Sequence, residues 1–137
     1  MSRWIGLAFL AAGAVNIIGM LVISRGFTND VLAISAPHAF STFGQAMIVV
    51  WGMAYISVAR SWKDVPWLCF VFFIEKMFYV SAWLIWWGNS ADQFSSILEQ
   101  DRMTAIFIAV YGANDLAFGL LFLCAFVFAK RSSASPQ

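Results

Sequence analysis

The stretch PWLCFVFFIEKMFYVSAWLIWW, residues 66–87, is apolar along almost its whole length and has Glu75 and Lys76 at its midpoint. It follows Asp64-Val65-Pro66, a helix-start pattern, and it ends at Gly88-Asn89. About 20 apolar residues in a helix are enough to cross the hydrocarbon core of a bilayer. This stretch therefore predicts a transmembrane helix that carries two charges at mid-depth.

Three further apolar runs of similar length predict three more spans: Trp4–Ser24, His38–Ala59 and Thr104–Ala129. The composition agrees, because 62% of the 137 residues are hydrophobic and 11% are charged, against about 45–50% and about 25% in soluble domains. We expect an all-α integral membrane protein: one domain over residues 1–137, with four transmembrane helices in an antiparallel up-down bundle and a short polar tail at 130–137.

The first run could instead be a cleaved secretory signal, with Ala11-Ala12-Gly13-Ala14 as the cleavage region. The apolar character continues well past that point to Ser24, so we interpret the run as a true span.

Basic residues set the expected orientation, because loops on the cytoplasmic side carry an excess of Lys and Arg. Five of them lie at the end of the bundle that would hold both termini, and Arg25 and Arg102 lie at the other; the five are Arg3, Arg60, Lys63, Lys130 and Arg131. We therefore expect both termini in the cytoplasm. A bacterial inner membrane is the location expected for so compact a chain. The net charge of +1 without a basic block argues against nucleic acid as a partner.

The connection from Gly88 to Met103 is expected to form a short amphipathic helix on the membrane surface. Ser90 to Gln93 has capping-box spacing, and Phe94, Ile97 and Leu98 follow with helical spacing.

The residues that bind metals and cofactors are few in this chain. Two cysteines without Cys-x-x-Cys spacing indicate neither a disulfide framework nor a zinc site, and the single histidine, His38, cannot supply a bis-histidine haem. No metal or cofactor is predicted.

Three ionisable residues fall at about the same depth inside predicted spans: Glu75, Lys76 and Asp115. Each costs about 2.5 to 3.5 kcal/mol at a helix centre, so each needs a partner or a function. Adjacent residues on a helix point in different directions, so Glu75 and Lys76 need different partners. We predict an ion pair between Lys76 and Asp115, with Glu75 as the unpaired acid.

Two acids and one base leave one surplus negative charge in a region of low dielectric. It can be removed by protonation of a carboxyl group, or by a bound cation or cationic ligand. The alternative interpretation is structural: a satisfied polar cluster that holds four helices in register.

Further polar and aromatic residues share faces with the three charges. Some could complete the hydrogen bonding, and Phe72, Tyr79 and Trp83 form an aromatic face with Glu75 that is either packing or the wall of a ligand site. The candidate ligand- or proton-binding residues are Glu75, Lys76, Asp115, Tyr79, Tyr111, Asn114, Gln45, Asn16, Trp83 and Phe72.

Three functions stay open. The first is a binding or accessory protein that associates with itself or a larger membrane complex, or that holds a lipophilic or cationic small molecule. The second is a proton- or cation-coupled transporter that works as an oligomer through Glu75. The third, an enzyme acting on a lipid-like substrate with Glu75 as general acid, comes last because no nucleophile and base pair can be identified.

Overall fold

The first predicted span forms one continuous helix with a local change of winding. A computed structural model describes residues 2–134 of the chain. Helix α1 (Ser2–Ala14) continues through a π-helical stretch, η1 (Val15–Gly19), into α2 (Met20–Ile23). Such stretches are rare and often occur at functional positions. Here the π-helical turn contains the buried Asn16.

A tight turn follows α2. Arg25, Gly26 and Phe27 have φ values of 51°, 66° and 70° in succession, which is uncommon for residues other than glycine. The turn is held by the Phe27 N–H, which donates to Ser24 Oγ, and by the Asn29 amide, which donates to the Ile23 carbonyl.

The prediction of one helix over His38–Ala59 is wrong. Two helices divide this region, α4 (Pro37–Phe40) and α5 (Thr42–Val58), and a further short helix, α3 (Asp30–Ser35), precedes them. Ser41 has a ψ of 160°, so it interrupts the helix, and its hydroxyl accepts a hydrogen bond from the Gly44 N–H. Ser41 is thus the N-cap of a new helix.

The third predicted span forms α6 (Pro66–Ser90), which has Pro66 in its first turn as predicted. It runs past the expected stop at Gly88-Asn89. The short helix predicted in the following connection is present as η2 (Ala91–Gln93) and α7 (Phe94–Gln100), but Ser90 makes no side-chain cap, and Ile97 is buried against the bundle.

The last helix, α8 (Arg102–Ala134), is longer than predicted at both ends. It includes most of the expected polar tail, and residues 135–137 of that tail lie outside the described part of the chain.

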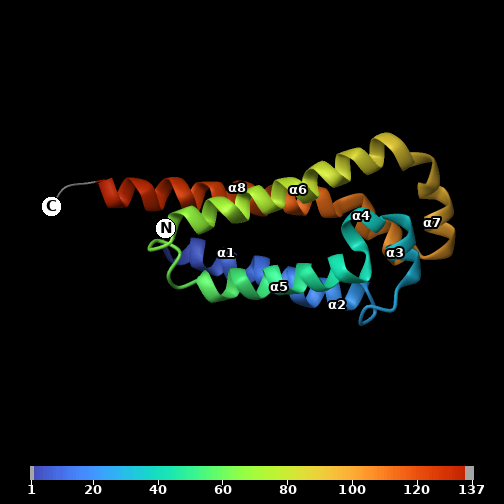
Figure 1. Ribbon diagram of the computed structural model, residues 1–137, viewed down its shortest axis with the longest axis horizontal. Coiled ribbons are helices and arrows are strands. Elements are labelled where there is room, and N and C mark those ends of the chain that lie inside the picture. Colours follow the sequence, from blue (N-terminus) through green and yellow to red (C-terminus); the bar gives the residue numbers. More distant parts are fainter. Residues whose placement is uncertain (1, 135–137) are drawn as a thin grey trace.

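The long helices form two antiparallel pairs (Figure 1). Helix α6 packs most extensively on α8, and α1 packs on α5. The start of α1, the end of α5, the start of α6 and the end of α8 lie at one end of the molecule, whereas α3, α4 and α7 gather at the other.

Two apolar clusters fill the interior. One contains Phe9, Tyr55, Phe72 and Phe122, and the other contains Phe40 with other residues nearer α3, α4 and α7. On α6 and α8 the buried charged residues lie between members of the two clusters, so the charges occupy the middle of the bundle.

The outer surface suits a lipid environment. Three stretches are long and apolar enough to cross a membrane: Arg3–Ile23, Pro66–Gln100 and Arg102–Ser132. Helix α5, with 17 residues, is apolar but spans only about 25 Å, less than the roughly 30 Å hydrocarbon core. Within residues 2–134 no strand is present, and large apolar side chains such as Trp4, Ile18 and Phe78 point outward.

Candidate functional site

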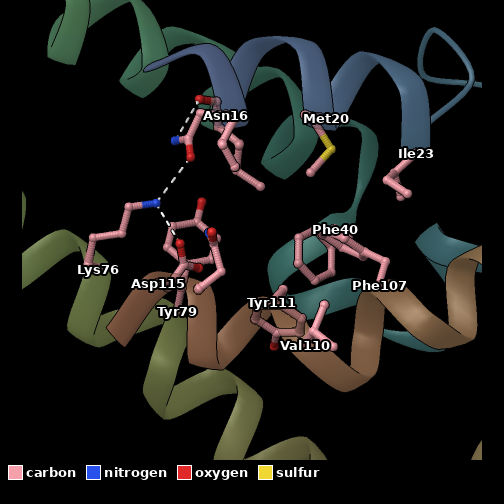
Figure 2. A pocket seen from close by; sticks show the side chains of 14 residues that line it. Asn16, Met20, Ile23, Phe40, Lys76, Tyr79, Phe107, Val110, Tyr111 and Asp115 are labelled. Carbon is pink, nitrogen blue, oxygen red and sulfur yellow. Dashed lines mark hydrogen bonds and ion pairs between the residues drawn. The ribbon is translucent and has the colours of Figure 1, made fainter. Parts of the chain in front are cut away.

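Lys76 and Asp115 form the ion pair predicted from their equal depth. Lys76 Nζ lies 2.6 Å from Asp115 Oδ1, and the Lys76 side chain is only 2% exposed. The same Nζ donates a hydrogen bond to Asn16 Oδ1 at 3.1 Å. Three elements, α6, α8 and η1, therefore meet at one ammonium group (Figure 2).

Asn16 extends this cluster to the fourth long helix. Its amide nitrogen donates to the Ile48 carbonyl of α5 at 3.3 Å. Gly52 permits this approach, because a Cβ at that position would lie 2.9 Å from the Asn16 Cβ. Asn16 therefore bonds directly to one of the three charged residues, Lys76.

Two tyrosine rings surround the ammonium group. Lys76 Nζ lies 5.4 Å from the ring centroid of Tyr55 and 5.9 Å from that of Tyr79. Both distances are within the range of cation–π attraction.

Glu75 has a different partner, as expected. One carboxylate oxygen, Oε2, accepts a hydrogen bond from the Tyr55 hydroxyl, and the other, Oε1, is buried without a partner. Tyr55 is absent from the predicted set. A signal for it exists in the sequence, since Gln45, Ile48, Gly52 and Tyr55 repeat at intervals of three and four and are all buried in α5.

A cavity of about 210 Å³ adjoins the ion pair. Asn16, Lys76 and Asp115 lie at one end, and Met20, Ile23 and Phe107 lie at the other (Figure 2). Its walls come chiefly from η1, α2 and α8 and are mostly apolar, with Tyr79, Tyr111 and Asn114 among the lining residues. We call this space the ion-pair cavity.

A second and larger hollow, of about 620 Å³, lies between α5 and α6 and is called the Glu75 groove. Its lining includes Glu75, Tyr79, Trp51 and Phe78, and it reaches His38 and Ser41 near the break between α4 and α5. Tyr79 lines both spaces.

Three of the predicted site residues lie elsewhere. Gln45 donates to the Phe40 carbonyl at the helix break, at 2.7 Å, and does not reach the charges. Trp83 donates to the Ile108 carbonyl at 2.9 Å, which links α6 to α8. Phe72 is fully buried in the apolar cluster beside Tyr55. The three residues of the predicted aromatic face therefore do not line one common site. Of the three, only Tyr79 lines a cavity.

Tyr111 serves mainly in packing although it also lines the ion-pair cavity. Its ring centroid lies 4.8 Å from that of Phe40 in an edge-on arrangement, and 5.6 Å from that of Phe107.

Within residues 2–134, no group of three or more His, Cys, Asp or Glu residues is placed to hold a metal ion.

Comparisons with known protein families, curated proteins and solved structures give no significant match.

Proposed function

We propose that this protein is a membrane-embedded binding or accessory protein that holds a lipophilic small molecule in the ion-pair cavity. The observation that carries the proposal is a mostly apolar cavity with a buried, hydrogen-bonding ion pair at one end. Ligand sites generally combine apolar walls with a few polar groups that orient the ligand.

The volume limits the size of this ligand. A cavity of about 150 Å³ lined by apolar side chains binds benzene, and the ion-pair cavity is larger, at about 210 Å³. One or two fused rings, or a short branched chain, would fit.

The electrostatics favour a ligand that is neutral and carries one polar group. Lys76 and Asp115 balance each other's charge, so a charged ligand would upset the balance. A hydroxyl group could donate to Asp115 and accept from Lys76, and Met20, Ile23 and Phe107 would contact the apolar part.

The same proposal includes the membrane arrangement: four spans, with both termini in the cytoplasm of a bacterial cell. It is supported by the position of the start of α1 and the end of α8 at one end of the molecule (Figure 1). Most of the basic residues outside the spans belong to that end, including Arg60, Lys63 and Lys130. Helix α5 would be the fourth span, lengthened by α4 and the Ser41 break.

Filling the cavity tests the binding proposal. Gly19 lines it, and a Cβ there would meet only Val15 Cγ1, at 4.0 Å. Gly19→Leu should therefore fold and occupy the space. We expect this variant, reconstituted in phosphatidylcholine nanodiscs, to bind 1-naphthol at least tenfold more weakly than the unaltered protein in equilibrium dialysis.

The matched control is Gly88→Leu, because Gly88 is exposed near the end of α6 and a Cβ there meets nothing within 4 Å. Its affinity for 1-naphthol should not change. Equal binding by the Gly19→Leu variant and the unaltered protein, or no binding by either, would contradict the proposal.

A further inference from the structure

The Glu75 groove has the features of a second binding site, distinct from the ion-pair cavity. It lies between α5 and α6 and has a volume of about 620 Å³. Phe43 and Phe78 line it and are 74% and 72% exposed, so their rings face the lipid in a bilayer. A lipophilic molecule could enter sideways from the membrane.

One polar group on its wall lacks a partner. Glu75 is 7% exposed, its Oε2 accepts from the Tyr55 hydroxyl, and its Oε1 makes no hydrogen bond. A buried acceptor without a donor is costly, and more so when it is charged. The terminal torsion of a glutamate is soft, so the carboxylate can turn Oε1 toward a ligand in the groove.

The surrounding charges do not neutralise Glu75. The Lys76 ammonium group, next along α6, is bonded to Asp115 and Asn16. Tyr55 of α5 donates a neutral hydroxyl, and Asp115 of α8 adds a negative charge that Lys76 already balances. His38 lines the groove beside the helix break. With all groups in their usual ionic forms, the cluster is one positive charge short.

We propose that the Glu75 groove binds a protonated lipophilic amine. The ammonium group donates to Glu75 Oε1, and the alkyl or aromatic body lies along Trp51, Phe78 and Tyr79. An ammonium ion supplies both the missing donor and the missing charge. A neutral alcohol supplies only a donor, and a quaternary ammonium ion supplies only a charge.

The first experiment uses the unaltered protein in phosphatidylcholine nanodiscs, with empty nanodiscs subtracted. Retention of dodecylamine, dodecanol and dodecyltrimethylammonium is measured at neutral pH. We expect dodecylamine to bind roughly tenfold or more tightly than either of the others, as a charge-assisted hydrogen bond would give. Equal retention of the three probes would overturn the proposal.

The second experiment removes the charge. Glu75→Gln keeps an acceptor for Tyr55 but loses the negative charge, and it should bind dodecylamine at least tenfold more weakly. Glu99→Gln is the matched control, since Glu99 is exposed on α7 and does not line the groove. This variant should bind dodecylamine as tightly as the unaltered protein does. Full retention of dodecylamine by the Glu75→Gln variant would overturn the proposal.

A third pair of variants keeps the proposal testable if Glu75→Gln does not fold. Ala82 lines the groove, and Ala82→Phe should block it, whereas Ala113→Phe adds the same ring at an exposed position of α8 outside both spaces. Only the first should lose dodecylamine, and loss in neither would contradict the site. Gly19→Leu, which fills the other cavity, should leave dodecylamine binding intact, so failure at either site can be told apart from failure at the other.

Discussion

At the scale of single residues, the interior is organised by one ammonium group. Lys76 contacts oxygen atoms from two other elements, Asp115 at 2.6 Å and Asn16 at 3.1 Å. Its neighbour Glu75 cannot share these partners, because adjacent side chains on a helix diverge by about 100°. The positions of the charges along the chain therefore predicted both the pair and the unpaired acid. They did not predict Tyr55, whose hydroxyl group reaches Glu75 only because the fold places α5 within side-chain reach of α6.

Removing one member of the Lys76–Asp115 pair should destabilise the protein strongly. Lys76→Met leaves the Asp115 carboxylate buried and unpaired, which in soluble proteins costs about 3 to 5 kcal/mol. The double variant Lys76→Met, Asp115→Asn removes both charges and should recover most of the loss. Thermal unfolding in detergent, followed by circular dichroism, gives the stability of Lys76→Met, of Asp115→Asn and of the double variant. A double variant as unstable as the sum of the single ones would show that the charges are not coupled.

At the scale of elements, glycine positions decide how closely the long helices pack. A Cβ on Gly112 of α8 would overlap the indole ring of Trp83 on α6, which also donates to the Ile108 carbonyl at 2.9 Å. Small residues at such crossings let membrane helices approach. The break at Ser41 acts at the same scale, since it divides the second apolar run into α4 and α5.

Gly112→Ala should weaken the contact between α6 and α8. A rigid ring fixed by a hydrogen bond cannot move aside easily, so we expect a loss of about 1 to 3 kcal/mol from overpacking, seen as a lower midpoint of thermal unfolding. Gly88→Ala is the control, since its Cβ meets nothing within 4 Å and alanine favours helix. An unchanged midpoint for Gly112→Ala would mean that this crossing is not tightly packed.

At the scale of the whole molecule, one ion pair at the end of the bundle ties the two helix pairs together. Arg25, in the turn after α2, lies 2.7 Å from Asp101, which precedes α8. Asp101 also accepts from the N–H groups of Met103 and Thr104 and from the Thr104 hydroxyl group. Burial raises the pKa of the Asp101 carboxyl, but the hydrogen bonds from Thr104 and the charge of Arg25 outweigh it, so the pKa lies below its usual 3.8.

The stability that Asp101 contributes should therefore depend on pH. A carboxyl whose pKa is lowered by folding stabilises the folded state above its unfolded pKa, and the effect is lost as the pH falls through the folded pKa. Asp101→Asn should lower the unfolding midpoint at pH 7, modestly because the Arg25 side chain is 52% exposed. The difference from the unaltered protein should shrink below about pH 3.8. A difference that stays constant from pH 7 to pH 3 would contradict this.

The sequence by itself determined the helical class, the apolar runs, the depth of the charges and the Lys76–Asp115 pair, because these follow from hydrophobic length and helical periodicity. Only the tertiary structure decided the break at Ser41, the Tyr55 contact, the burial of Phe72 away from any cavity, and the two spaces that Tyr79 lines. The physical reason is that periodicity assigns each side chain a direction on its own helix. Which helix lies opposite, and how closely, depends on packing among residues far apart in the chain.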